Sequence, residues 1–437
     1  MIPGFLKDKR AFVLFGLSWI AAGILLPKIA LPLVLISILV FKYRNHYEEI
    51  FLGLYLVLFF SDSYYQGFQF AHDSKPFYMF LMAGLYFLSR KDFPDFNKFI
   101  YSFAPFLILA ALVIPKSEIV DICWQKTLSY ALLLLLVPNY ITKLYKEEGE
   151  LFFRNFIALL ATILLVSLFF WYFKLGHVGV KRFQGFLGNP NAMGLFCTTF
   201  FLLFMVVRQY FPDLFSRRET ILIYVLIFVA VILSGSRNTW MSLIIFIFFR
   251  AFYRISPYIG FILFVGILFS YEFFTENIHP LIRYLGLGEY LREDTLDKGS
   301  GRLVAWAFGW DQIKLNMFFG KGFAHEEFIY YAYGNQQKLN LLGHDGASHN
   351  SYLATWLNSG LFGVILYFSA FFSKFIRSAK NTNIGMPVLF SILWSANFES
   401  WLVGSLNPYT ILLLICLTIM TGDEFNKEDH HDPVPLL

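Results

Sequence analysis

Long apolar runs alternate with short polar connections along almost the whole chain. The runs hold about 15–25 residues and are rich in Phe, Leu and Ile, and a helix of that length crosses a hydrocarbon core of roughly 30 Å. The pattern predicts an all-α polytopic membrane protein with spans near 11–26, 28–42, 48–61, 76–90, 99–115, 127–143, 151–174, 191–209, 219–234, 239–253, 256–272, 349–374, 384–398 and 408–421. Because the first two runs are short and almost lack a connector, we expect about 12–14 transmembrane helices.

The composition agrees with a membrane protein. Of the 437 residues, 57% are hydrophobic and only 15% are charged, and the mean hydropathy is +0.58. A soluble domain of this length carries more charge because it must solvate its surface. The net charge of +5 is modest and indicates no nucleic-acid binding, and the three cysteines form neither a CxxC pair nor a disulfide framework.

Lysine and arginine are distributed unequally between the connections on the two sides. Since cationic loops remain in the cytoplasm, we expect both termini there and the long connection 273–348 in the periplasm of a two-membrane bacterium. The chain then divides into N-terminal transmembrane helices (1–180), a second region (181–421) and a cytoplasmic tail (422–437). The cations of the expected cytoplasmic side are Lys7, Lys9, Arg10, Lys42, Arg44, Arg90, Lys91, Lys98, Lys143, Lys146, Arg154, Arg208, Arg217, Arg218, Arg250, Arg254, Lys374, Arg377, Lys380 and Lys427.

Three cations break this rule, and they lie in polar connections of the outer side. Lys181 and Arg182 open KRFQGFLGNPNAMG (181–194), whose glycines and Asn-Pro-Asn run exclude a continuous helix. Arg237 lies in SGSRNTW (234–240), the entire connection between two apolar runs. An ordinary turn and a snorkelling side chain explain such residues as well as an anionic ligand does.

Two further polar stretches map to the same side. In GSGRLVAWAFGWDQI (299–313), Arg302 and two tryptophans recur at helical spacing, which indicates a helix on the membrane surface, an anion site at a helix start, or both. In GHDGASHNSYLATWLNSGLFG (343–363), His349 lies where a loop meets a span, with Asn350 beside it. A lone histidine is usually structural, but this one shares the outer side with three arginines.

Together these residue types favour transfer of a group from a diphosphate-linked donor to a hydroxyl acceptor. Arginine stays charged at any working pH and binds phosphate oxygens with its forked N–H groups, so it can stabilise a leaving pyrophosphate. Histidine accepts a proton near neutral pH and can activate the attacking oxygen.

The order of the motifs resembles the O-antigen ligase and polymerase superfamily, bacterial membrane glycosyltransferases that use undecaprenyl-diphosphate-linked glycans. The resemblance covers roughly 180–420 and is carried by GNPN, SGSR, GR-x3-W, the G-x-G of GKGF (320–323) and HN-x-YL-x2-W-x3-GL-x-G. It implies an all-helical fold related to class C glycosyltransferases, a large helical periplasmic loop within 273–348, and a catalytic region over 181–421.

The resemblance also implies roles for individual residues. His349 would be the base on the acceptor hydroxyl, and Arg237, Arg302 and Arg182 would hold the diphosphate. An acidic family position in the penultimate span falls on Glu399, which indicates either function or pairing with an arginine. The supporting polar residues of the same motifs are Asn350, Asn189 and Asn191.

The leading hypothesis is an O-antigen ligase of the inner membrane that moves a finished glycan onto lipid A–core. An O-antigen or exopolysaccharide polymerase and a protein O-oligosaccharyltransferase share the donor chemistry and remain alternatives. A transporter of lipid-linked glycans is the alternative from another class, and it would need cations along a path through the membrane. The resemblance implies no cofactor and no metal, and the tail KEDHHD (427–432) is expected to be solvated rather than to bind metal.

Overall fold

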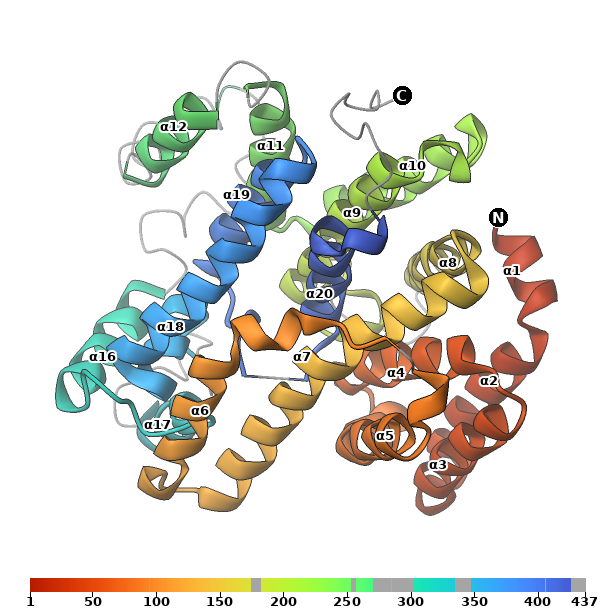
Figure 1. Cartoon of the computed structure of the whole chain (residues 1–437), viewed down its shortest axis with the longest axis horizontal. Coiled ribbons are helices and arrows are strands. Elements are labelled where there is room, and N and C mark those ends of the chain that lie inside the picture. The colour runs from red at the N-terminus through yellow and green to blue at the C-terminus, as the bar shows by residue number, and fades with distance from the viewer. Residues whose placement is uncertain are drawn as a thin grey trace. The chain divides into compact units, whose positions relative to one another are not determined.

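The computed structural model describes residues 1–93, 95–173, 182–252, 257–269, 284, 302–334, 347–404 and 406–425. Within these residues the regular structure is helical, with 17 α-helices and several short 3-10 turns (Figure 1). A helix lies at each of the predicted spans, so the expected all-α fold is confirmed.

Length and exposure of the helices fit a lipid environment. Among the described residues, four helices are long and apolar enough to cross a membrane, and shorter apolar helices accompany them. The four are Val120–Glu148, Leu151–Tyr172, Pro190–Tyr210 and Ser351–Asn381. Large side chains such as Leu25, Leu112 and Ile262 are exposed on helix surfaces, where water would disfavour them and acyl chains would not. The protein is a polytopic membrane protein.

The chain forms two compact units, and neither is continuous in sequence. Unit 1 comprises Met1–Ile100, Ala131–Thr239 and Leu406–Leu437. Its helices are α1 (Ile2–Asp8), α2 (Arg10–Leu25), α3 (Pro27–Tyr43), α4 (Tyr47–Ser61), α5 (Gln69–Leu88), the second part of α7 (Val120–Glu148), α8 (Leu151–Tyr172), α9 (Pro190–Tyr210), α10 (Arg217–Ser234) and α20 (Pro408–Thr421).

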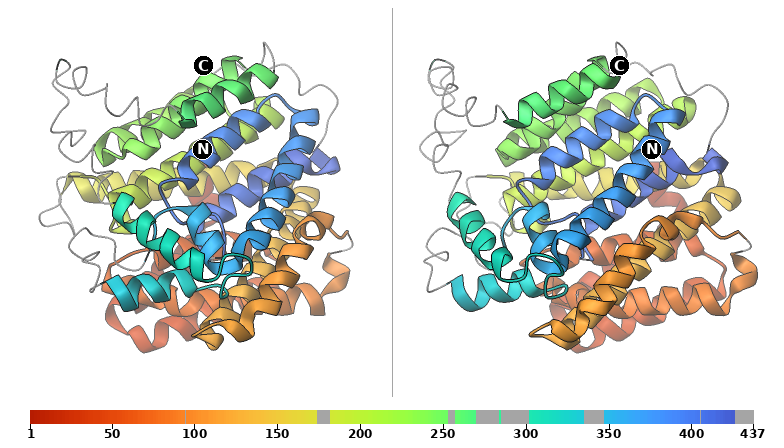
Figure 2. Two further views of the ribbon diagram at one scale, coloured as in Figure 1. Left: turned by 90° about the vertical axis from the view of Figure 1, so that its left-hand side faces the viewer. Right: turned by 60° about the vertical axis from the view of Figure 1, so that its left-hand side comes forward.

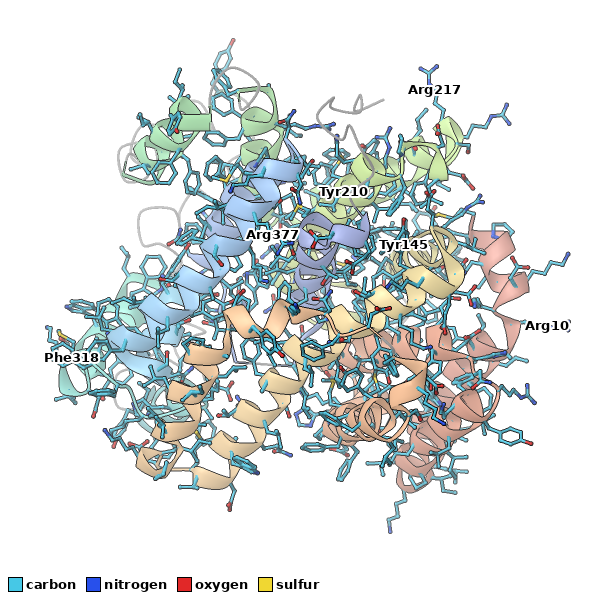
Figure 3. The ribbon with its side chains drawn as sticks, viewed as in Figure 1. Arg10, Tyr145, Tyr210, Arg217, Phe318 and Arg377 are labelled. Atoms are coloured by element: carbon cyan, nitrogen blue, oxygen red, sulfur yellow. The ribbon has the colours of Figure 1, made fainter. Side chains whose placement is uncertain are left out.

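Helices α9 and α20 form the interior of unit 1. They pack against each other, and nearly all of their residues are buried. In contrast to these buried residues, Arg10 and Arg217 at the starts of α2 and α10 are exposed and extend away from the ribbon (Figure 3).

Unit 2 comprises Tyr101–Tyr130 and Trp240–Ser405. It contains α6 (Ala104–Val113), the first part of α7, nearly all of α11 (Arg237–Phe252), α12 (Pro257–Phe269), α16 (Arg302–Leu315), α17 (His325–Gly334), α18 (Ser351–Asn381) and α19 (Gly385–Ala396). Both α16 and α17 pack on α18, and Figure 2 shows them beside its first half. The described part of the predicted loop 273–348 therefore contains two helices, as expected of a helical loop.

Asparagine caps set the starts of three helices. Asn189 precedes Pro190 at the start of α9, and Asn407 precedes Pro408 at the start of α20, with each asparagine side chain accepting a backbone N–H of the first turn. Proline fits the first helical position because its missing N–H has no partner there in any helix. Asn350 caps α18 in the same way.

Helix α18 breaks at Gly360, which the apolar pattern did not predict. Gly360 has φ of 70°, and the segment 317–322 fills the break with backbone hydrogen bonds. The amides of Leu361 and Phe362 donate to the carbonyls of residues 317 and 318, and the Gly322 amide donates to the carbonyl of residue 358. The backbone N–H and C=O groups that lose their helical partners at the break thereby gain new hydrogen bonds, as buried backbone groups require.

We expect Gly360→Ala to destabilise the protein by at least about 2 kcal/mol. An added Cβ would lie 2.3 Å from backbone atoms of Phe318 and Phe319, and the positive φ disfavours any side chain. The measurement is thermal unfolding in detergent. Gly266→Ala in α12 is the matched control, because a Cβ there meets nothing within 4 Å. Equal melting temperatures of the two variants would contradict the argument.

Candidate active site

A glutamate joins the histidine and one arginine of the predicted site within unit 2. Oε2 of Glu399, in the loop after α19, lies 3.0 Å from Nδ1 of His349. Oε1 of the same carboxylate accepts a hydrogen bond of 3.0 Å from Nη2 of Arg302, the first residue of α16. The three side chains are 26%, 15% and 16% exposed for His349, Glu399 and Arg302, so the group is sheltered but reachable.

The contact with Glu399 selects the tautomer of the His349 ring. An ionised carboxylate can only accept a hydrogen bond, so the proton of the neutral ring lies on Nδ1. The lone pair then lies on Nε2, which is the ring atom that can accept a proton. A carboxylate behind a histidine is the arrangement that orients a general base in hydrolases of unrelated folds.

The backbone holds His349 in a conformation that is rare for a histidine. Its φ is +50°, in the left-handed region. The next residue, Asn350, caps α18 by accepting the N–H groups of Tyr352 and Leu353. Ser351 donates from its hydroxyl to the carbonyl of Glu399 at 2.6 Å. The loop of the histidine and the loop of the glutamate are thus bound to each other.

Charges around His349 favour its protonated form. Burial is the largest influence and lowers the pKa of His349, but the hydrogen bond and negative charge of Glu399 outweigh it, and the pKa is raised. Burial raises the pKa of Glu399, yet His349 and Arg302 outweigh this effect and the pKa is lowered. A second histidine of unit 2, His325, also contacts a carboxylate, but burial lowers its pKa.

Arg302, at the start of α16, contacts an aromatic ring and has one N–H group without a hydrogen-bond partner among the described residues. Its guanidinium lies 5.7 Å from the centre of the Phe398 ring, and its Nε–H is buried without a hydrogen-bond partner among the described residues. Four residues later on the same helix, Nε1 of Trp306 donates to the carbonyl of Ser348 at 3.0 Å. The predicted helical spacing of this stretch is confirmed, and it binds α16 to the turn that carries His349.

The first two polar stretches meet within unit 1. Nε of Arg182 donates to the carbonyl of Ser234 at 2.7 Å, and its Nη2 donates to Oδ1 of Asn191 at 3.2 Å. Gly194 contacts Ser236 so closely that a Cβ would lie 2.7 Å from the serine Cβ. Arg182 therefore caps the last turn of α10 and connects it to the start of α9.

Arg237 is the first residue of α11, directly after this junction. Gly235 ends α10 in the left-handed conformation, with φ of 55°, so the chain turns within two residues. The N-terminal end of a helix favours anions. Lys181, the other expected outer-side cation, lies outside the described residues.

The amino-acid sequence of residues 222–368 matches the family model of O-antigen ligase. An O-antigen ligase domain is thus matched over this part of the chain. Members of the family are membrane glycosyltransferases that act on lipid-linked glycans. Among curated proteins, none matches the chain.

The O-antigen ligase domain contains most of the candidate site. It includes Arg237, Arg302 and His349, whereas Arg182 precedes the matched residues and Glu399 follows them. The resemblance was therefore correct in family. The roles of these individual residues stay predictions.

Sequence reasoning missed a carboxylate of the O-antigen ligase domain that lies behind the site. Glu326, in the first turn of α17, accepts hydrogen bonds from Ser348 and Ser400, the neighbours of His349 and Glu399 in sequence. The stretch HEEF (325–328) carries no motif that singles out Glu326. Its one signal is an acidic pair next to an apolar run, which is also typical of an ordinary helix start.

The described residues contain no group of three or more His, Cys, Asp or Glu that could hold a metal ion. The acidic and histidine-rich tail at 427–432 lies outside them. What the site offers is a proton acceptor, a carboxylate that orients it, and an arginine.

Proposed function

We propose that the protein is an O-antigen ligase that transfers a glycan from undecaprenyl diphosphate to a hydroxyl of lipid A–core. The observation that carries the proposal is the contact of His349 with Glu399 and of Glu399 with Arg302, at an O-antigen ligase domain. These contacts bring a candidate base, His349, and a candidate diphosphate-binding cation, Arg302, to the carboxylate of Glu399. We place the reaction at the periplasmic face, with both termini cytoplasmic, because of the asymmetric lysines and arginines.

In the proposed reaction, Nε2 of His349 accepts the proton of the acceptor hydroxyl. The acceptor oxygen forms a bond to the anomeric carbon of the donor sugar, and the bond between that carbon and the phosphate oxygen breaks. Undecaprenyl diphosphate leaves with the bonding electrons, and the positive charge of Arg302 stabilises it. The histidine then returns its proton to solvent, and the chain regains its starting state.

The arginines have separate tasks in this proposal. Arg302 contributes one Nη2 hydrogen bond to Glu399, which leaves other N–H groups of the guanidinium for phosphate oxygens. The sequence motifs make Arg237, at the start of α11, our second candidate for binding the diphosphate. Arg182 fixes the end of α10, just before Arg237, by hydrogen bonds to Ser234 and Asn191. The acceptor distinguishes a ligase from a polymerase, since the donor chemistry is common to both.

The glycolipid profile of a deletion strain tests the ligase against its alternatives. We expect lipid A–core without any O-chain, long glycan remaining on the carrier, and full restoration by the wild-type gene. Core capped by a single repeat would instead identify a polymerase. An unchanged ladder would refute both and direct attention to protein glycosylation or another surface polysaccharide.

A further inference from the structure

The buried carboxylate of Glu326 accepts three hydrogen bonds at one oxygen. Its Oε1 lies 2.8 Å from the backbone nitrogen of Ser348, 2.5 Å from the Ser348 hydroxyl and 3.0 Å from the Ser400 hydroxyl. The residue is 5% exposed. Its own backbone N–H donates to Oδ1 of Asn358 in α18, which fixes the start of α17 as well.

Among the residues that the structure describes, no cation forms an ion pair with Glu326. Burial is the main influence and raises that pKa, while the hydrogen bonds from Ser348 and Ser400 oppose it. Taking an unpaired carboxylate out of water costs several kcal/mol. The three donors and the positive end of α17 offset this cost, so the carboxylate and the two serines depend on one another.

The two serines are the immediate neighbours of the proposed catalytic pair. Ser348 precedes His349, and Ser400 follows Glu399. The Ser400 hydroxyl also accepts the backbone N–H of Asn350 at 3.0 Å, so the residues on both sides of His349 are held. A non-glycine residue with positive φ, such as His349, persists only where its surroundings fix it. Glu326 accepts the hydrogen bonds that fix the residues around His349.

We propose that Glu326 is a positioning residue for glycan transfer, because its carboxylate fixes the turn before His349 and the loop after Glu399 against each other. This inference rests on the proposed function, since it assigns Glu326 a part in orienting the base. Glu326 itself touches neither substrate nor the reacting atoms.

Two substitutions separate the hydrogen bonds of Glu326 from its charge. Glu326→Ala removes the acceptor, and we expect kcat to fall about 10–100-fold, with the donor KM nearly unchanged, because the base is misplaced. Glu326→Gln keeps an acceptor oxygen and should regain most of this loss. Glu327→Gln is the matched control: the next residue is 56% exposed and pairs with Lys126, and its kcat should equal that of the wild type.

The pH profile gives a readout that a purely structural role would not move. Within the described part of the chain, the charged groups with the largest effects on His349 are Glu399, Arg302 of α16 and Glu326 of α17, and Glu326 raises the histidine pKa. Removing the negative charge in Glu326→Gln lowers that pKa, so the rising limb of rate against pH shifts to lower pH. Two results together would overturn the inference. One is a kcat loss in Glu326→Ala that is fully explained by a lower melting temperature, and the other is a rising limb of the pH profile that stays in place in Glu326→Gln.

A measurement without turnover separates this inference from the proposed function. The Cε1 resonance of His349, assigned with His349→Asn in protein carrying labelled histidine, should titrate at lower pH in Glu326→Gln than in the wild type or Glu327→Gln. An unchanged resonance and titration in both Glu326 variants would refute positioning by Glu326. Absence of glycan transfer by the wild-type protein from a purified lipid-linked donor would instead refute the proposed function.

Discussion

His349→Ala is expected to lower the rate of glycan transfer by about 10²–10⁴-fold, the usual contribution of a general base. The ring offers Nε2 to the acceptor because Glu399 occupies Nδ1, and alanine removes this proton acceptor. Expression and folding should be retained, since the cap of α18 belongs to Asn350. The measurement is initial rate with purified protein, lipid-linked donor and core acceptor.

Two further variants make this test specific. Asparagine tolerates the left-handed conformation, so His349→Asn removes the base while it preserves the φ of +50° at this position. His72→Ala is the matched control, because His72 is 60% exposed and belongs to unit 1. Wild-type turnover in His349→Ala and His349→Asn would show that another group activates the acceptor.

The same assignment predicts how the wild-type rate depends on pH. A base acts only when deprotonated, and Glu399 raises the pKa of His349 above the ordinary histidine value. The rate should therefore rise with pH through a limb that lies above the ordinary pKa of about 6.5.

Apolar run length was sufficient to locate the helices, because the hydrocarbon thickness sets the length of a spanning run. Their ends were less predictable. Helix α5 begins at Gln69, ahead of the predicted residue 76, and α18 continues to Asn381, past residue 374. Polar residues are tolerated in these extensions, since the backbone hydrogen bonds of a helix do not depend on the apolarity of its side chains.

The candidate site shows what tertiary structure adds. Arg302 and Glu399 are 97 residues apart in the sequence, so no local pattern pairs them. The sequence predicted His349 at the start of a span or one residue before it, and the structure places it one residue before the cap of α18. The break at Gly360 could not be predicted from the sequence, because the residues around it keep the apolar character of a continuous helix.

Arg302→Lys is the second large effect that we expect, with transfer reduced about 10–100-fold through loss of charged hydrogen bonds. Lysine keeps the charge but has no planar fork, so it cannot bind Glu399 and a phosphate oxygen in the geometry that Arg302 offers. The contact with Phe398 is lost as well. Both the donor KM and kcat should worsen, as the arginine acts on the bound and the leaving diphosphate.

The charge that Arg302→Lys retains gives the prediction a further consequence. Arg302 lowers the pKa of His349 through its charge, so the pH limb should stay nearly in place although the rate falls. An unmoved pH limb indicates loss of diphosphate binding, whereas loss of the orientation of His349 would move the limb. Arg217→Lys is the matched control, because Arg217 is exposed at the start of α10 and extends away from the ribbon (Figure 3). Wild-type donor affinity and rate in Arg302→Lys would remove the arginine from the mechanism and leave Glu399 as its structural partner.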